Sequence, residues 1–338
     1  MDSNPTNDRS TNQTACGRDG SGGSARRLGV ALSKDLRDFR RRLKVCWHRP
    51  DAEAIHQLRV QTRRMVVWCD LLGVLDADHH QIREARRRLK KLLRSLARLR
   101  DLQVQVILLT SVPKRLEPAA RRLKRDLRNE EPHWDQRVKE RLRRIRPSRL
   151  SSLMLGGETA ATVVSAAIQA ADPNGEAVVV GRWLMELQDA AETRLHDARG
   201  GSPGALHRFR IAVKHLRYGL EAVSGSFVGI SATTLRRLRN LQGKLGAIQD
   251  FEVCRVRLET LTGRHPGWTD ELDPLRRWLL QQRDGRIRRL IGNDPALLTP
   301  PVRLRVVRPA ASGTSSARES PPAPPFQRRG RPAARTGR

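Results

Sequence analysis

The chain has 338 residues and is strongly basic, with 66 Lys and Arg against 35 Asp and Glu, a formal net charge of +31 and a pI near 11.6. A hydrophobic content of 38% argues against disorder throughout, and the scarcity of aromatic and β-branched residues beside Leu, Arg and Ala argues against an all-β sandwich. The excess of positive charge predicts a polyanionic partner, which could be a nucleic acid, an anionic membrane surface or a polyphosphate.

The charge is unevenly distributed along the chain. Successive blocks carry −1 in residues 1–24, +20 in 25–150, +4 in 151–296 and +8 in 297–338. The first block has the Gly- and Ser-rich composition of a linker, and the last is rich in Pro and Arg. We therefore expect a disordered head over 1–24 and a disordered tail over 297–338.

The part between these ends has helical periodicity. Apolar residues recur at steps of three and four in three groups, namely Leu36, Phe39, Leu43 and Trp47; Leu89, Leu92, Leu93, Leu96 and Leu99; and Leu235, Leu238, Leu241, Leu245 and Ile248. Asp51 is placed to cap one helix, and Ser202 followed by Pro203 is placed to begin another. No stretch alternates as a strand does, so the predicted fold class is all-α.

Two motifs occur twice, in the same order. Residues 55–65 match residues 206–216 at an offset of 151, and residues 96–104 match 245–253 at an offset of 149. The chain is therefore predicted to be a duplicated helical unit forming a bundle with pseudo-twofold symmetry. Its expected parts are a first half over 25–150, a Ser-, Gly- and Ala-rich connector over 150–176, and a second half over 177–296.

At these motifs the sequence resembles the CHAD family, the conserved histidine α-helical domain, over roughly residues 28–292. The family pattern is a His-x-x-Arg-x-x-x-[Arg/Lys] helix in each half, followed by a Leu-Gly-x-x-x-Asp-type helix. The matching residues are His56, Arg59, Arg63, Arg64 and Leu96 to Asp101 in the first half, and His207, Arg210, Lys214, His215 and Leu245 to Asp250 in the second. One departure is Ala97, where the second half has Gly246.

This resemblance implies a compact domain of two four-helix halves that binds inorganic polyphosphate in a basic pore or groove. Proteins of this kind are often fused to a triphosphate-cleaving tunnel domain. Such a domain would need a β-barrel carrying a Glu-x-Glu-x-Lys motif, and this sequence contains neither signal.

The residues themselves also predict anion binding. His56, Arg59 and Arg63 share one face of their helix, and His207, Arg210, Lys214 and Arg217 share a face of theirs. Arginine suits bidentate contacts to phosphate, and a row of cations along a helix suits a linear anion. The alternatives are a solvated basic face and, for each histidine, a structural hydrogen bond to a neighbouring helix.

The downstream helices add further candidates. Lys90, Lys91, Arg94 and Arg98 extend the positive surface of the first half, whereas Arg239 lies on the stripe of Asp250 together with Gly243, Gly246 and Cys254. The small residues of this stripe predict the close approach of another helix. Asp101 and Asp250 are expected to orient Arg or Lys side chains of the repeat helices. The alternative for Asp101 is a simple pair with Arg98 along one helix.

The polyphosphate-binding residues expected from this reasoning are His56, Arg59, Arg63, Arg64, Lys90, Lys91, Arg94, Arg98, His207, Arg210, Lys214, His215, Arg217 and Arg239. No carboxylate cluster, Walker loop or nucleophile elbow is present, so we expect no enzyme activity, no metal and no cofactor. The cysteines show no zinc or redox spacing and are expected to be reduced thiols. Residues 160–171 are too short and polar to span a bilayer, and no signal peptide precedes Arg26.

The sequence thus predicts a cytoplasmic polyphosphate-binding protein that accumulates on polyphosphate granules and has no membrane partner. Basic runs such as residues 86–91 and 121–128 leave non-specific nucleic-acid binding as the second hypothesis. Exposed aromatic residues for base stacking are few, and no nucleic-acid-binding motif is present, which counts against it. A scaffold that recruits other proteins to granules is the third hypothesis.

Overall fold

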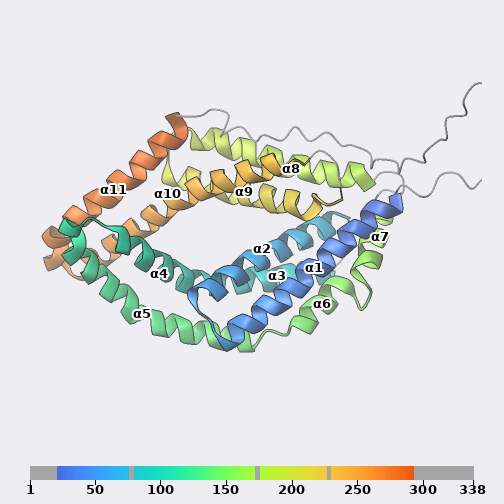
Figure 1. Ribbon diagram of the computed structural model, residues 1–338, viewed down its shortest axis with the longest axis horizontal. Helices are drawn as coiled ribbons and strands as arrows, with labels where there is room; N and C mark the ends of the chain where they lie inside the picture. The colour runs from blue at the N-terminus through green and yellow to red at the C-terminus, as the bar shows by residue number, and fades with distance from the viewer. Residues whose placement is uncertain (1–20, 76–79, 172–175, 227–229, 293–338) are drawn as a thin grey trace, which may run out of the picture.

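The computed structural model describes residues 21–75, 80–171, 176–226 and 230–292. Every regular element in these ranges is helical, which confirms the all-α prediction (Figure 1). The elements are α1 (Ser21–His48), α2 (Ala52–Leu75), α3 (His80–Ser95), α4 (Ala97–Leu108), the 3₁₀ turns η1 (Leu109–Ser111) and η2 (Lys114–Leu116), α5 (Glu117–Arg143), α6 (Pro147–Leu155), α7 (Ala160–Ala171), α8 (Glu176–Ala198), α9 (Pro203–Val223), α10 (Ala232–Arg264), the 3₁₀ turn η3 (Pro266–Trp268) and α11 (Thr269–Gly292).

The helix ends follow local sequence signals. The Asp51 carboxylate accepts a hydrogen bond of 2.8 Å from the backbone N–H of Ala54, so it caps α2 as predicted. Pro203 begins α9 as predicted, although the preceding Ser202 makes no capping hydrogen bond with its side chain. α1 begins at Ser21, earlier than the expected boundary at residue 25. The rest of the expected head, and the expected tail over 297–338, lie outside the described residues.

The main apolar core forms around α2, which packs against α1, α3 and α9. Leu36, Phe39 and Leu43 of α1 are buried in this core, as their spacing predicts. Trp47, the fourth member of that group, lies at the edge: its indole Nε1–H donates to the Leu142 carbonyl at 2.8 Å, and the residue is 40% exposed. An indole at a helix edge can thus keep its polar atom bonded while its ring covers neighbouring helices.

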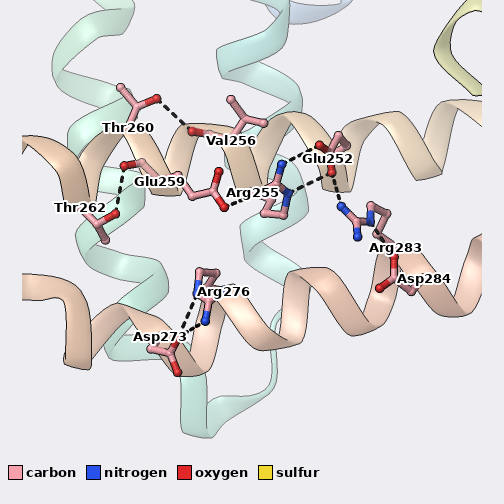
Figure 2. A network of polar contacts seen from close by, with 10 residues as sticks. All are labelled: Glu252, Arg255, Val256, Glu259, Thr260, Thr262, Asp273, Arg276, Arg283 and Asp284. Atoms are coloured by element: carbon pink, nitrogen blue, oxygen red, sulfur yellow. Dashed lines mark hydrogen bonds and ion pairs between the residues drawn. The ribbon is translucent and has the colours of Figure 1, made fainter. Parts of the chain in front are cut away.

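A second apolar core lies where α4, α5, α10 and α11 meet, at the left end in Figure 1. Arg257 of α10 is 7% exposed there and bonds to two carboxylates of α5, those of Asp126 (2.7 Å) and Glu130. Figure 2 shows the polar link between α10 and α11, in which Glu252 accepts from Arg255 at 2.7 Å and from Arg283 at 2.6 Å. These bonds fix α10 between its two neighbours.

The order of packing is the same in the two repeats. α1, α2, α3–α4 and α5 pack in succession, and so do α8, α9, α10 and α11. α3 and α4 are interrupted only at Leu96, so together they correspond to the single long helix α10. The repeats contact each other through α2 against α9 and α4 against α10. This order agrees with four helices per half, and an exact pseudo-twofold relation stays a prediction.

The expected connector over 150–176 contains helices. α6 packs against α3, and α7 packs along α1. The contact of α7 with α1 is closest at Gly29, where an added Cβ would lie 2.7 Å from the backbone nitrogen of Ala161. The small residues of this segment therefore serve helix packing, because they let two backbones approach each other.

The three cysteines that the structure describes, Cys46, Cys69 and Cys254, are free and buried. Burial raises the pKa of the Cys46 and Cys254 thiols to about 12, which keeps both protonated and unreactive near neutral pH. The expectation of reduced thiols agrees with this for these three residues, whereas Cys16 lies outside the described residues.

Candidate functional site

A cavity of about 350 Å³ lies between α2, α3, α4, α9 and α10, where the two repeats meet. Its polar lining residues are Arg59, Arg63, Lys90, Asp101, Gln105, His207, Arg210, Lys214, His215, Gln249 and Asp250. Its apolar lining residues are Val66, Leu93, Val104, Ile211 and Val253. We call this the central cavity.

Both copies of the repeat contribute matching residues to the walls. The pairs related by the offsets of 151 and 149 residues are Arg59 with Arg210, Arg63 with Lys214, Asp101 with Asp250, and Val104 with Val253. The two cationic stripes predicted from the sequence therefore face one common space. This answers one of the alternatives, since these cations do not lie on two separate solvated faces.

Most of the positive charge in the central cavity lacks a bonded carboxylate. Arg59 donates from Nη1 to the Leu93 carbonyl at 3.0 Å, which fixes its side chain across α3. The Nε of Arg210 is buried and has no hydrogen-bond partner. Within the described ranges, none of Arg59, Arg63, Lys90, Arg210 and Lys214 forms an ion pair.

Burial of these cations and their mutual repulsion lower their pKa values. Lys214 is 8% exposed, and its pKa is lowered to about 6, first by loss of solvent and then by repulsion from Arg210 and Arg63. The same causes lower the pKa of Arg59 to about 10. This shift favours the neutral form of Lys214 in the folded protein, and an anion bound beside it would favour the charged form.

The two carboxylates of the central cavity have the opposite shift. Burial raises the pKa of Asp101 and that of Asp250, and the arginines around them only partly counteract it. Asp101 acts electrostatically on Arg59 of its own repeat and on Arg210 of the other. No hydrogen bond joins either carboxylate to another group in the part of the chain that the structure describes. Asp101 and Asp250 therefore lie near the cations that they are predicted to orient, and this role stays a prediction.

The two repeat histidines are in different environments. Nδ1 of His207 lies 2.7 Å from Oε1 of Gln249, so its N–H donates to an amide of α10. His56 does not line the central cavity, and its pKa is lowered by burial and by Arg100, the residue that corresponds to Gln249. The structural alternative for a histidine, a hydrogen bond to a neighbouring helix, is therefore observed for His207.

A family model described as the CHAD domain matches residues 30–259. The chain belongs to the CHAD family. This confirms the resemblance found in the sequence, and the family is linked in general to polyphosphate binding. The chain is also similar to the crystal structure of the CHAD domain from the plant Ricinus communis, with a TM-score of 0.60 and 20% identity over 81% of this chain and 93% of that one. A comparison with curated protein sequences finds no match.

Within this CHAD domain, three predicted site residues turn away from the cavity toward one carboxylate. Glu221 of α9 accepts from Arg217 at 3.1 Å, from Arg239 at 3.2 Å and from Arg64 at 3.2 Å. The Arg217 guanidinium also lies 4.2 Å from the ring centroid of Tyr218. This cluster joins α2, α9 and α10 just outside the central cavity, so these arginines are placed to support the walls.

The remaining predicted residues lie elsewhere on the domain. Arg98 bonds to Glu130 at 3.0 Å, so the proposed pair of Arg98 with Asp101 along one helix does not form as a hydrogen bond or ion pair. Lys91 and Arg94 line a second cavity on another side of α3. Of the fourteen expected residues, the central cavity brings together Arg59, Arg63, Lys90, His207, Arg210, Lys214 and His215.

The expected approach of a helix over the small residues of α10 is wrong. A Cβ at Gly243 would meet no atom within 4 Å, and one at Gly246 would meet only the Nε of Arg210, at 3.9 Å. The space belongs to an arginine side chain of α9 that reaches into the cavity. The difference between Ala97 and Gly246 in the CHAD motif is therefore sterically harmless, because an ordinary contact would result in the second half too.

Two polar cavity residues were absent from the expected set. Gln249 was part of the matched motif, and its position one residue before Asp250 was the available signal. Gln105 carries a buried side-chain oxygen without a hydrogen-bond partner, and no feature of the sequence marks it. Among the residues described, none of the His, Cys, Asp and Glu side chains gather in a group that could hold a metal ion. In the same part of the chain, no helix is long and apolar enough to cross a membrane.

Proposed function

We propose that this CHAD protein binds inorganic polyphosphate in the central cavity and does not cleave it. The observation that carries the proposal is the convergence of five cationic side chains, from α2, α3 and α9, on one cavity without a bonded carboxylate among the described residues. Buried cations of this kind are costly unless an anion compensates them. A phosphate polymer supplies one negative charge per repeat and needs no base-specific contact.

The lining of the central cavity favours polyphosphate over nucleic acid. Among the residues that the structure describes, its walls carry polar and aliphatic side chains and no Phe, Tyr or Trp on which a base could stack. The guanidinium groups of arginines from both repeats can bind oxygens of one phosphate chain at the same time. Asp101 and Asp250 are the two carboxylates of the cavity lining, and they belong to no group of described residues that could hold a metal ion. The cavity therefore gives no support to a magnesium-dependent phosphoryl transfer.

The test is a titration of the full chain with polyphosphate at several salt concentrations. If the five cavity cations contact phosphate, log Kd should change with log salt with a slope of about 3 to 4, using 0.7 per contact for a single strand. The variant Arg59→Glu with Arg210→Glu should weaken binding by about 100-fold or more. A matched control is Arg125→Glu with Arg128→Glu, which changes the charge equally at two exposed positions of α5 outside this cavity.

Two outcomes would contradict the proposal. The first is a cavity variant that stays folded by circular dichroism and still binds polyphosphate as the control does. The second is release of phosphate, or shortening of the polymer seen by ³¹P NMR, on incubation with the protein and magnesium. Competition should also show polyphosphate displacing DNA at fewer phosphate equivalents than the reverse.

In cells that contain polyphosphate granules, the same proposal places the protein on them. A fluorescent fusion of the full chain should colocalise with granules, and the Arg59→Glu with Arg210→Glu variant should be diffuse. A variant lacking residues 297–338 tests the scaffold hypothesis. If that deletion alone abolishes granule association, the tail and not the central cavity directs the protein there.

A further inference from the structure

A second cavity, of about 560 Å³, lies where α3 faces the end of α5 and the beginning of α6. We call it the outer basic cavity. Its charged lining residues are Glu84, Arg87, Arg88, Lys90, Lys91, Arg94, Arg141, Arg144, Arg146 and Arg149, and its apolar ones are Phe39, Leu89, Leu92, Ile145 and Leu150. Nine cations therefore surround a space that contains a single carboxylate.

That carboxylate compensates only two of the cations. Glu84 pairs with Arg87 at 2.7 Å and with Arg88 at 2.6 Å, both on its own helix. The other lining cations have no ion pair within the described residues. Arg141 in addition holds a buried Nε that has no hydrogen-bond partner. Like charges around one cavity repel one another, so an anion that enters it would stabilise the arrangement.

Favourable interactions with the helix dipole do not explain why all of these basic residues lie at the junction of α5 and α6. Basic residues at the C-terminal end of α5 suit its dipole, but Arg146 and Arg149 lie at the N-terminal end of α6, where cations are unfavourable. α6 also begins without a side-chain cap, because Arg146 occupies the N-cap position and makes no capping hydrogen bond. The first-turn backbone N–H groups of α6, which lack a side-chain cap, are a further set of donors near Arg146 and Arg149.

The outer basic cavity holds part of the charge excess of the first repeat. Lys91 and Arg94 correspond to Asn240 and Gly243 in the second repeat, at the offset of 149 residues. The other three cations of this row have basic equivalents, since Arg87, Arg88 and Lys90 correspond to Arg236, Arg237 and Arg239, so the second repeat has a shorter basic row on its long helix. The outer basic cavity holds nine of the 35 basic side chains of residues 25–150 and one of the 15 acidic ones.

Lys90 connects the two sites, because it lines both the central cavity and the outer basic cavity. We propose that a single phosphate polymer occupies both: one stretch lies in the central cavity, the chain passes Lys90, and a second stretch lies between α3, α5 and α6. The inference rests on the proposed function for the first stretch. The ligand of the second stretch is a linear polyanion of phosphate groups, and the outer basic cavity makes the protein selective for long chains.

The experiment compares tripolyphosphate with long-chain polyphosphate on the full-length protein. The variant is Arg144→Gln with Arg149→Gln, two exposed arginines that do not line the central cavity. The matched control is Arg125→Gln with Arg128→Gln, which removes the same charge from exposed positions outside both cavities. Kd is measured for each ligand at several salt concentrations.

We expect the variant to bind tripolyphosphate within about twofold of the unmodified protein and the control, and to bind long-chain polyphosphate about tenfold more weakly. The slope of log Kd against log salt for the long chain should decrease by about 1.4, which is 0.7 for each lost phosphate contact. The inference is overturned if long-chain binding is no weaker than in the control, or if tripolyphosphate binding is weakened equally.

A third variant separates this inference from the proposed function. Arg59→Gln with Arg210→Gln should bind tripolyphosphate at least about tenfold more weakly, because the central cavity is the proposed site of the short chain. If that variant binds tripolyphosphate normally, the proposed function fails. If it binds tripolyphosphate more weakly while the Arg144→Gln with Arg149→Gln variant behaves as its control, the proposed function stands and the extended path is wrong.

Discussion

Lys214 is expected to reduce stability in exchange for binding, and its replacement by Met tests this. The side chain is 8% exposed, has no ion pair within the described ranges, and has a pKa lowered from 10.5 to about 6. Methionine has a similar length and no charge, so Lys214→Met keeps the packing of α9 and removes the titrating group. We expect a more stable protein that binds polyphosphate more weakly.

The size of the gain follows from the pKa shift. At pH 7 the lysine is charged in the unfolded protein, whereas its lowered pKa favours the neutral form in the folded protein. Removing the proton from a lysine of pKa 10.5 at pH 7 costs about 5 kcal/mol, which is an upper limit on the loss of stability. Water entering the open central cavity reduces this penalty, so we expect the substitution to stabilise the protein by about 1 to 3 kcal/mol. For a domain of this size that is a rise in Tm of about 2 to 10 °C.

The sign of the pH dependence is a second check on the same variant. Because the folded pKa lies below the unfolded one, the unfolded state binds more protons between pH 6 and about 10.5, and stability lost to Lys214 is regained as pH rises through that window. The advantage of Lys214→Met should therefore be largest at pH 6 and below, and should shrink toward pH 10.

The assay is calorimetric or fluorescence-monitored unfolding of the full chain at pH 6, 7 and 9.5, without polyphosphate. The control is Lys244→Met, which replaces an exposed lysine on α10 and should change stability by no more than about 0.5 kcal/mol. A Lys214→Met protein that is no more stable than this control, or whose advantage is the same at pH 9.5 as at pH 6, would refute the reasoning.

Three further predictions concern other parts of the molecule. Polyphosphate affinity should rise by up to about tenfold per unit as pH falls from 8 to 6, since binding protonates Lys214, and the Lys214→Met variant should lack that rise in binding titrations. Arg257→Met removes a buried partner from two carboxylates of α5, which keep Arg264 and Arg98 as partners, and should lower the free energy of unfolding in urea by about 1 to 3 kcal/mol; an unchanged stability would contradict it. Gly29→Ala should destabilise the protein by about 2 kcal/mol or more, because the added Cβ overlaps the backbone of Ala161. At Gly73 an added Cβ meets no atom within 4 Å, so Gly73→Ala should stabilise the protein by about 0.5 to 1 kcal/mol. Equal melting temperatures of the two variants would contradict this contrast.

The sequence was sufficient for the repeat helices and their cations. Spacing within a helix determines which residues share a face, and the duplication indicated that the faces of Arg59 and Arg210 are equivalent. Their meeting in one cavity follows from the packing of α2 against α9, which agrees with a duplicated unit. Asp51 as a cap was predictable for the same reason, because capping depends on residues three positions away.

The partners of the other cations were beyond sequence reasoning. Arg64, Arg217 and Arg239 share their stripes with cavity residues, but Glu221 binds all three from three helices. Only the spacing of Arg217 and Glu221, four residues apart on one helix, gave a local signal. The bond of Arg98 to Glu130 likewise depends on how α5 folds back along α4, which no local pattern encodes.

Only part of the outer basic cavity could be predicted from the sequence. The row on α3 was recognised as positive surface, but the arginines that complete the cavity lie about 50 residues later, at a helix junction created by Pro147. A net charge of +20 over residues 25–150 indicated an excess without indicating its location.

The two separate apolar cores have a consequence for motion. α4 and α10 pass from one core to the other beside the central cavity, and α5 and α11 also contribute residues to both cores. Although four helices join the two cores, each core is expected to open as a separate unit, so the amide hydrogens of Leu123 and Leu275 in the second core should exchange with solvent independently of those of α2. A polymer held at the junction ties both units together, so its binding should slow exchange far from any phosphate and merge the two rates into one.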